Sequence, residues 1–445
     1  MENNRSNIGL KALVVCGLIL GLMIPTLFIN NLVFERKNRQ NDAFKEVSSK
    51  WAEKQTITGP VISIPFMEYF KAADGTVNQA RNYIHVLPEE LKITGNVVPE
   101  KRYRGIYEII VYGSTINLQG RFKALQTANP KINKKDILFN EAFISVGISD
   151  LRGLKEQVNL NWNTESSAFN PGVESKDVVQ SGISAPVNLI TNENADSEYS
   201  FSLNLNLKGS QSLYFTPVGK ETFVDLKSNW NSPSFDGAFL PEARNVTDTG
   251  FTAHWKVLNL NRNYPQSWSN NSFDVQNSYF GINLYLPIDN YTKTDRSIKY
   301  AILFIGLTFL TFFFLELLNR KSIHPLQYIL IGFALCIFYI LLLSISEQIN
   351  YNRAYLIAAV MTIGLITWYS RSILKAPKLS TLVAGNLIIL YGFIFIIIQL
   401  EDLSLLIGSL GLFLILTLVM YFSKRINWSE YSRNKTDVTE IKNAE

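Results

Sequence analysis

The sequence predicts a helical membrane protein that carries one large, mainly β domain. Residues 299–422 contain five apolar runs with few charges, and about 20 consecutive apolar residues are enough for an α-helix to cross a bilayer. Residues 58–297 are polar and contain short stretches in which apolar and polar residues alternate, separated by Gly, Pro, Asn and Asp. Such alternation is typical of β-strands that have one buried face.

Five membrane spans are predicted in the C-terminal part of the chain, because no soluble domain would bury so much continuous Leu, Ile and Phe. Together they form a predicted five-helix bundle at residues 298–423, which is followed by a tail at residues 424–445. The spans cover residues 299–318, 326–346, 352–369, 379–398 and 402–422.

A sixth span is predicted at residues 8–33, within an N-terminal segment of residues 1–33. A secretory signal peptide is the alternative interpretation. No small residues suited to cleavage follow the apolar run, and we therefore expect an uncleaved anchor helix. Gly17 and Gly21 have the GxxxG spacing that lets another helix approach closely. In the alternative, both glycines face lipid.

Residues 34–57 are expected to form an amphipathic helical connector that packs on the following domain. Apolar residues recur there among charged ones, namely Phe34, Ala43, Phe44, Val47 and Trp51.

The β domain is predicted to cover residues 58–297 and to be antiparallel. Its clearest strand is at residues 201–207, where Phe201 and three leucines alternate strictly with polar residues. Residues 163–200 are rich in Ser, Asn and Gly, and we expect them to form an irregular connection.

The distribution of basic residues predicts the orientation in the membrane. Loops with an excess of Lys and Arg stay in the cytoplasm, and here they follow the second, fourth and sixth spans. Six spans then place both termini in the cytoplasm and the β domain outside. A basic cluster just beyond the first span disagrees, but long domains translocate largely regardless of such charges. The concordant residues are Arg320, Lys321, Arg371, Lys375, Lys378, Lys424, Arg425, Arg433 and Lys435, and the discordant ones are Arg36, Lys37 and Arg39.

Several classes of function are disfavoured by the sequence. The net charge is only +5, and no basic run interleaved with aromatics indicates nucleic-acid binding. Cys16 and Cys336 both lie in apolar runs and are expected to pack as small hydrophobic residues. The three histidines are far apart, and no nucleotide-binding or nucleophile motif is present. We therefore expect no metal site, no cofactor and no enzymatic activity.

Polar residues inside the predicted spans are candidate functional residues, because ionisable groups are costly in a membrane. Glu316 lies near the inner end of the second span, whereas Glu347 lies at the outer end of the third and shares a helix face with Ser344. The two carboxyl groups are at opposite faces and are not expected to form a pair. His324 precedes Pro325 at the start of the third span, and Asn386 is expected to form a helix–helix hydrogen bond. The structural alternative for Glu316, Glu347 and His324 is contact with water or lipid headgroups.

Two further groups of candidates lie in the β domain. Asp150 and Arg152 belong to a compact polar cluster at residues 147–153, where they are expected to pair or to cap a turn. Phe235 and Phe239 lie in a segment at residues 232–241, which is interpreted as an ordered loop. These two aromatics are either buried anchors of that loop or part of a binding patch.

Several segments of the chain, including those that hold the candidate residues above, resemble the CreD family of bacterial inner-membrane proteins, described as cell envelope integrity proteins. The resemblance covers nearly the whole chain in order, and its most specific elements are His-Pro-x-Gln-Tyr and Ser-x-Ser-Glu. Gln348 departs from the histidine expected after that glutamate. The matching segments are GPVISIP at 59–65, ISDLRG at 148–153, SPSFDGAFLP at 232–241, NLNRNYPQSW at 259–268 and the spans at 299–358.

The resemblance implies a cellular context but no reaction. Members of the family are linked to colicin tolerance, envelope stability and a two-component response to cell-wall stress and β-lactams. We therefore expect an inner-membrane protein that supports envelope integrity or a stress response, without catalysis, and that binds an envelope component through a periplasmic β domain. Its expected partners are the lipid bilayer and an envelope component or membrane protein. A transporter or channel-like protein is the alternative, and an enzyme acting on a lipid or wall precursor is a third interpretation.

Overall fold

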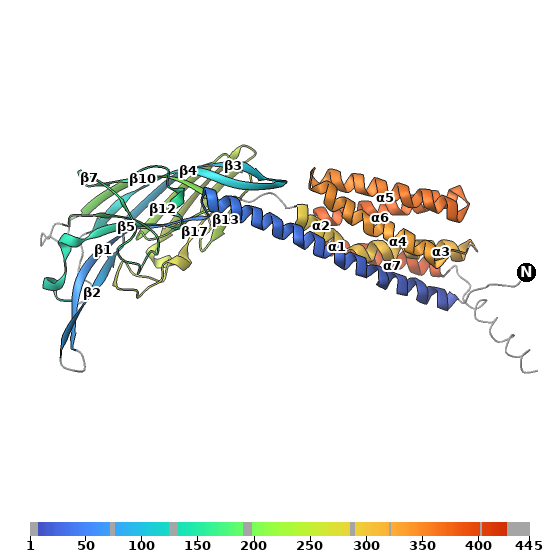
Figure 1. Cartoon of the computed structure of the whole chain (residues 1–445), viewed down its shortest axis with the longest axis horizontal. Coiled ribbons are helices and arrows are strands. Elements are labelled where there is room, and N and C mark those ends of the chain that lie inside the picture. The colour runs from blue at the N-terminus through green and yellow to red at the C-terminus, as the bar shows by residue number, and fades with distance from the viewer. Residues whose placement is uncertain are drawn as a thin grey trace, which may run out of the picture. The chain divides into compact units, whose positions relative to one another are not determined.

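The computed structural model describes residues 8–71, 76–123, 132–189, 198–284, 290–319, 322–400 and 403–424. The chain divides into two compact units (Figure 1). The membrane unit consists of Met1–Gln40 and Ile288–Glu445, and the β unit consists of Asn41–Pro287.

Seven α-helices are described, of which six are long and apolar enough to cross a membrane. The prediction of six spans is therefore confirmed. The seventh is the short polar helix α2, which the sequence analysis did not predict. The helices are α1 (Ile8–Trp51), α2 (Asn290–Lys299), α3 (Ala301–Leu318), α4 (Pro325–Ser346), α5 (Tyr351–Leu374), α6 (Pro377–Gln399) and α7 (Ser404–Ser423).

Local sequence signals explain where several of these helices begin and end. Pro325 and Pro377 open α4 and α6, at a position where the missing N–H is not needed. The Asn350 side chain accepts a hydrogen bond from the Arg353 N–H and so caps α5. Lys375 ends α5 in the left-handed conformation, at a φ of 44°.

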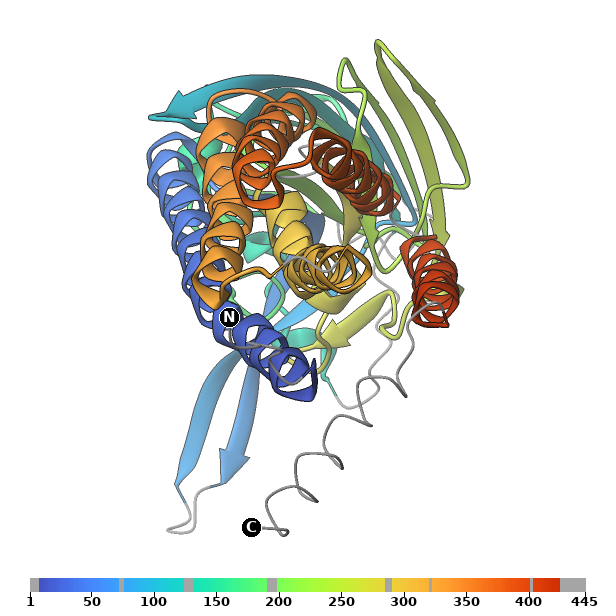
Figure 2. The same cartoon turned by 90° about the vertical axis from the view of Figure 1, so that its right-hand side faces the viewer.

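Aromatic side chains form the interior of the membrane unit between α3, α4, α5 and α6. Phe338 packs edge-on against Tyr339, Tyr355 and Tyr391, with ring centroids 4.8–5.4 Å apart. Phe304 adds a tilted contact with Tyr391 at 4.5 Å. In contrast, none of the hydrophobic window of α7 is buried, and Figure 2 shows this helix at the edge of the group. Helices α3 to α6 therefore share a packed aromatic core, and α7 lies at its periphery.

Helix α1 approaches α4 at a glycine that the sequence analysis did not single out. A Cβ atom added at Gly332 would lie 2.1 Å from Leu22 Cδ1, whereas nothing lies within 4 Å of a Cβ added at Gly17 or Gly21. Both glycines are exposed, and no described residue comes close to them, so of the two interpretations the structure favours the one in which Gly17 and Gly21 face lipid. The close approach occurs instead at Gly332 of α4, where a missing side chain admits Leu22 of α1.

The β unit is built from two sheets. The nine-stranded sheet has the order β13-β17-β11-β1-β5-β9-β8, and β2 pairs with β1 and with β16. Its strands are β13 (Pro233–Gly237), β17 (Phe280–Leu284), β11 (Ser212–Thr216), β1 (Gln55–Lys71), β5 (Phe143–Ile148), β9 (Gly182–Pro186), β8 (Asn170–Pro171), β2 (Val77–Val86) and β16 (Ser267–Ser269).

The eight-stranded sheet has the order β14-β15-β12-β3-β4-β10-β6-β7. Its strands are β14 (Ala243–Thr247), β15 (Gly250–Leu258), β12 (Glu221–Ser228), β3 (Glu90–Arg104), β4 (Tyr107–Lys123), β10 (Glu198–Ser210), β6 (Asn159–Trp162) and β7 (Glu165–Ala168).

The mainly β prediction is confirmed, with two corrections. Both sheets are mixed rather than purely antiparallel, because β1 pairs in parallel with β11 and β12 pairs in parallel with β3. These partners are far apart in sequence, so local alternation carries no information about their direction. Residues 163–189, part of the expected irregular connection, contribute the short strands β7, β8 and β9; residues 190–197 lie outside the described part of the chain.

One hydrophobic cluster takes its residues from both sheets. The alternation predicted in β10 is confirmed, because its four apolar side chains are all buried. Ile64 of β1 and Trp255 of β15 are fully buried in the same cluster. The last turns of α1 also pack on the β unit, because Phe44, Val47 and Trp51 contact Ile109 and Val111 in a smaller cluster.

Candidate functional site

Glu316 is a buried carboxylate that joins three segments of the membrane unit. Its exposure is 4%, and Lys11 Nζ of α1 lies 2.5 Å from its Oε1 atom. The backbone N–H of Ile323 donates to the same oxygen at 3.2 Å, and the Tyr328 hydroxyl of α4 donates to Oε2 at 3.2 Å. A buried ion pair is tolerated when further hydrogen bonds satisfy its charges, and this cluster meets that condition.

Glu347 forms a second, looser cluster at the C-cap of α4. The Tyr291 hydroxyl of α2 donates to its Oε1 atom at 3.0 Å, and Arg36 Nε of α1 lies 3.7 Å from the same oxygen. The Glu347 side chain is 11% exposed. The two candidate carboxylates are therefore not a pair. Each has its own basic partner in α1.

The spacing of those basic partners matches a membrane span. At 1.5 Å per residue, about 38 Å of helix separates Lys11 from Arg36, slightly more than the ~30 Å thickness of a hydrocarbon core. The α1 helix is thus fixed to the rest of the membrane unit by one ion pair near each end of its apolar segment.

Helix α2 forms a polar layer against α4, α5 and α6. Its Lys293 Nζ donates to Gln399 Oε1 of α6 at 3.0 Å, and the Ser297 hydroxyl lies 2.6 Å from the Tyr351 hydroxyl of α5. Asn290 Nδ2 donates to the Ser346 carbonyl of α4 at 2.8 Å. A sequence signal for this helix was present, since Lys299 and Asp295 form an i,i+4 ion pair.

The remaining membrane candidates have structural roles. His324 Nδ1 accepts a hydrogen bond from the Leu326 N–H at 3.3 Å, so this histidine caps α4. Asn386 Nδ2 of α6 donates to Thr311 Oγ1 of α3 at 2.8 Å, which is the expected interhelical hydrogen bond. Ser344 is exposed, and the described contacts of the Glu347 carboxylate are with Tyr291 and Arg36 rather than with Ser344.

An apolar cavity of about 400 Å³ lies beside Asn386, between α3, α6 and α7. Thr311 and Asn386 are its polar lining residues, and they bond to each other. The cavity therefore suits hydrocarbon rather than an ion or a polar solute.

In the β unit, Asp150 and Arg152 form a bidentate pair. Arg152 Nε and Nη2 donate to the two carboxylate oxygens, each at 2.9 Å. Asp150 also accepts the Arg152 N–H at 3.1 Å, which caps the short turn at Leu151–Gly153. The expected pair and the expected turn cap are thus both present.

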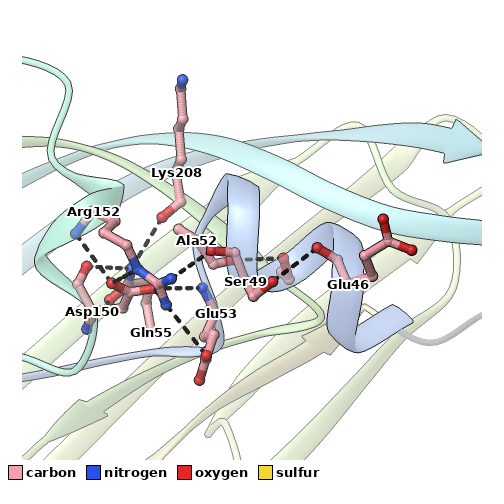
Figure 3. Close-up of polar contacts among 9 residues, drawn as sticks. Glu46, Ser49, Ala52, Glu53, Gln55, Asp150, Arg152 and Lys208 are labelled. Atoms are coloured by element: carbon pink, nitrogen blue, oxygen red, sulfur yellow. Dashed lines mark hydrogen bonds and ion pairs between the residues drawn. The ribbon is translucent and has the colours of Figure 1, made fainter. Parts of the chain in front are cut away.

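This pair also receives the end of helix α1 (Figure 3). Arg152 Nη1 donates to the Ser49 carbonyl at 2.5 Å, and the Glu53 N–H donates to Asp150 Oδ2 at 2.9 Å. Gln55 Nε2 donates to the carbonyls of Asp150 and Lys208 at 2.9 and 3.1 Å. Basic side chains are favourable partners for the free carbonyls at a helix C-terminus. We call Ser49, Glu53, Gln55, Asp150, Arg152 and Lys208 the helix junction.

The electrostatics of the junction favour the ionised carboxylate. Burial raises the pKa of Asp150, but hydrogen bonds from the Arg152 side chain and from the Glu53 and Arg152 N–H groups outweigh it and lower that pKa. One helical turn earlier, Glu46 accepts two hydrogen bonds from Arg104 of β3, at 2.9 and 3.1 Å. The side-chain hydrogen bond from Lys50, followed by that from Arg104, lowers the pKa of Glu46.

Phe235 and Phe239 are partly buried anchors that pack on the core of the β unit. Phe235 makes edge contacts with Phe251 and Trp255, each at 5.8 Å between ring centroids. Phe239 makes the same contact with Phe280. The segment at residues 232–241 is not simply a loop, because Pro233–Gly237 forms strand β13. Of the two interpretations of its aromatics, the structure favours buried anchors over a binding patch.

A buried Ser–His–Asp relay was missed by the sequence analysis. Ser63 Oγ of β1 lies 2.9 Å from His85 Nδ1 of β2, and His85 Nε2 lies 3.1 Å from Asp177 Oδ2. The arrangement has the composition of a hydrolase triad. However, Ser63 is only 3% exposed in the middle of a paired strand. A substrate has no access to its hydroxyl, and the relay acts as a link that holds Asp177 to the sheet.

A polar groove crosses the exposed face of the eight-stranded sheet. Its volume is about 840 Å³, and it is lined by residues of β3, β4, β12, β14 and β15. The side chains that face it include amides and hydroxyls together with Asp225 and Lys227. Arg244 alternates with Ala243 and Asn245 along β14, so its side chain lies on the opposite face, over the Phe235 ring. Cross-strand register brings the lining residues together from distant strands, so the groove has no signal in the linear sequence. It is a candidate ligand site in the described part of the β unit.

A family model described as "Inner membrane protein CreD" matches residues 7–429 of the chain. The chain belongs to the CreD family. Inner membrane protein CreD of Escherichia coli strain K12 is 31% identical over 424 residues, which cover 94% of this chain and 93% of that protein. Together with its six long apolar helices, membership makes the chain a multi-span inner-membrane protein embedded in the lipid bilayer.

Several segments that suggested the CreD family have a structural explanation. The His-Pro-x-Gln-Tyr element supplies the cap of α4 and Tyr328, a ligand of the Glu316 carboxylate. The ISDLRG element supplies Asp150 and Arg152 of the helix junction. Among the residues that the structure describes, no group of three or more His, Cys, Asp or Glu is arranged to hold a metal ion.

Proposed function

We propose that this CreD-family chain is a non-enzymatic envelope-integrity protein that couples a ligand-binding β unit to a membrane bundle. In this proposal, the β unit lies in the periplasm and binds an envelope component, and both termini lie in the cytoplasm. The basic loops after the second, fourth and sixth spans support this orientation.

The observation that carries the proposal is the continuity of α1. This single helix of 44 residues contributes to both compact units. In the membrane unit it is bonded to Glu316 and Glu347. In the β unit it is bonded to Arg104 and to the Asp150–Arg152 pair. A simple tether would require none of these fixed points, whereas a helix that transmits force or movement requires them at both ends.

The transporter alternative receives less support. Transporters commonly have broken helices and polar sites near the middle of the membrane. Here the six spans are continuous, and the Asn386 amide is engaged by Thr311 beside an apolar cavity. An enzyme on a lipid or wall precursor receives less support still, because the Ser63–His85–Asp177 relay is closed to substrate.

The proposal is tested by complementation of a deletion strain under detergent or a cell-wall antibiotic. Arg36→Ala and Glu347→Gln remove the outer fixed point of α1, whereas Arg39→Ala removes only an exposed ion pair with Glu35 within the same helix. We expect the first two variants to reach normal membrane abundance and to rescue poorly, and the Arg39 variant to rescue fully. Full rescue by all three would contradict the coupling role.

Orientation is tested separately by labelling single cysteines in intact cells with a membrane-impermeant maleimide, after Cys16 and Cys336 are replaced by Ser. A cysteine at exposed Thr252 should react from outside, and one at Lys424 should react only after lysis. The opposite pattern would overturn the periplasmic assignment.

A further inference from the structure

We propose that the cleft between α3, α6 and α7 holds one acyl chain of an anionic phospholipid, with the lipid phosphate at the lysines beside the open end of the cleft. The inference goes beyond the proposed function, because it concerns the membrane unit alone and assigns a bound lipid to it. It is carried by the length of the cleft, by its closed and open ends, and by the charge at the open end.

The cleft has the length of one lipid leaflet. Its lining runs from Leu307 to Leu318 on α3 and from Leu382 to Phe393 on α6, and each of these segments rises about 16 Å at 1.5 Å per residue. The hydrocarbon core of a bilayer is about 30 Å thick, so the chains of one leaflet fill about 15 Å. An extended acyl chain from one leaflet therefore matches the depth of the cleft.

One end of the cleft is closed by direct contact between α6 and α7. A Cβ atom added at Gly411 of α7 would collide with the Phe393 ring of α6, so the ring packs onto bare backbone there. At the other end, Leu318 of α3, Leu382 of α6 and Leu418 of α7 keep exposures of 44–52%. The cleft is therefore open at the end where α3 and α7 finish and α6 begins.

The space between these ends requires an apolar filler. Protein interiors leave few voids larger than a water molecule, whereas the volume of this cleft is about 400 Å³. Its polar lining residues, Thr311 and Asn386, bond to each other, and the other lining residues are Leu, Ile, Val, Phe and Gly. A hydrocarbon chain makes the dispersion contacts that such walls offer, whereas ordered water would lack the polar partners that it needs.

The open end of the cleft carries lysines that have no acidic partner. Lys378 lies one turn before Leu382 on the same face of α6, and Lys424 follows the last turn of α7. Both lysines are exposed, and neither makes an ion pair with a residue that the structure describes. Glu316, the single acidic residue of α3, is already paired with Lys11. The charge at this end therefore favours an anion supplied by a ligand.

The first turn of α6 adds to this preference for an anion. Its N-cap residue, Ala376, makes no side-chain hydrogen bond to the helix, and the turn contains no acidic residue. The N-terminus of a helix carries a partial positive charge and free N–H groups. A phosphate at this position would meet that partial charge together with the Lys378 ammonium, while its acyl chain enters the cleft. Basic sites between transmembrane helices are known to bind anionic lipid headgroups.

Lipid binding is tested by native mass spectrometry of the delipidated full-length chain in detergent micelles. The probes are dioleoyl phosphatidylglycerol and dioleoyl phosphatidylcholine, which share their acyl chains and differ in net charge. We expect one phosphatidylglycerol molecule to be retained with about tenfold higher affinity than phosphatidylcholine, equivalent to about 1.4 kcal/mol. Lys378→Ala should remove most of this preference, because it removes the ammonium that faces the phosphate.

Two neighbouring positions of α7 distinguish the cleft from the general lipid-facing surface. Ile415 lines the cleft, whereas Leu416 is exposed and does not line it. Ile415→Trp should fill the cleft and weaken retention of both lipids, and Leu416→Trp should leave retention unchanged. Arg371→Ala is the matched control for charge, because this exposed arginine belongs to α5, which does not contribute to the cleft.

Three outcomes would overturn the proposal. Equal affinity for the two lipids would show that no anion is selected, and an equal loss of preference in the Arg371 and Lys378 variants would assign the preference to general surface charge. Equal retention by the Ile415 and Leu416 variants would place the lipid outside the cleft. These outcomes are independent of the deletion-strain assay, so the lipid site can fail while the coupling role stands, and the reverse.

Discussion

Lys11 and Glu316 are 305 positions apart in the chain, yet the ammonium nitrogen lies 2.5 Å from the carboxylate oxygen. This ion pair and the looser pair of Arg36 with Glu347 fix both ends of the apolar part of α1. Ionisable residues inside spans are costly unless they are paired. Their presence here is explained by the attachment of α1 to the remaining helices.

The buried pair predicts a strong energetic coupling between its two members. Glu316→Gln leaves the ammonium without its counter-ion, and Lys11→Met leaves the carboxylate with only neutral donors. Each single change should destabilise the chain in detergent by roughly 1–3 kcal/mol, below the range for fully buried pairs, because Lys11 is partly exposed. The double variant should lose less free energy of unfolding than the sum of the losses in the two single variants. Additive losses in this thermal-unfolding cycle would show that the pair does not act as a unit.

The contact of Leu22 with Gly332 predicts that a side chain at position 332 displaces α1. Gly332→Val should lower the free energy of unfolding in detergent by roughly 1–3 kcal/mol, because the new side chain would occupy the space of Leu22. Gly364→Val is the control, because nothing lies within 4 Å of a Cβ at that exposed position of α5. Equal effects of the two variants would mean that helix propensity, and not packing, sets the cost.

The helix junction predicts local unfolding when its carboxylate is neutralised. Asp150→Asn keeps the shape of the side chain but weakens its hydrogen bonds to Arg152 and Glu53, at a cost of about 1–2 kcal/mol. Amide hydrogen exchange should accelerate at residues 47–53 in the full chain. Glu156→Gln, which changes a carboxylate elsewhere in the β unit, should leave exchange at those residues unchanged. Unaltered exchange in the Asp150 variant would contradict the junction.

The buried relay predicts that acid destabilises the β unit. Burial lowers the pKa of His85, and the hydrogen bond and charge of Asp177 only partly oppose this shift. The unfolded chain, with an ordinary histidine pKa of about 6.5, therefore binds more protons than the folded chain as the pH falls. The stabilisation from neutral His85 is complete above the pKa of the unfolded chain. It is lost as the pH falls through that pKa towards the lower pKa of His85 in the folded chain.

The relay is tested by denaturant unfolding of the full chain between pH 7.5 and 5. The free energy of unfolding should fall with pH in the natural sequence and should fall less in His85→Asn. His254→Asn, on the exposed face of the other sheet, serves as the control and should keep the slope of the natural sequence. The same slope in the His85 variant would assign the acid sensitivity to other groups.

The described spans were readable from the sequence because each one satisfies its own backbone hydrogen bonds within a continuous run of residues. Strand character in β10 was readable for a similar reason, since alternation reports which face is buried. The Asp150–Arg152 pair was also accessible, because its members are two residues apart. These properties depend on neighbours in the chain.

By itself, the sequence determined the six apolar helices, the mainly β character of the polar region and the local turn cap at Asp150. Only the tertiary structure decided which basic residue neutralises Glu316 and Glu347, where α1 approaches α4, which strands run parallel and which polar side chains share the groove. The physical reason is that these features join positions tens to hundreds of residues apart. Lys11 has no local signal that points to Glu316, and Lys227 meets Asn96 only because two distant strands pair in one register.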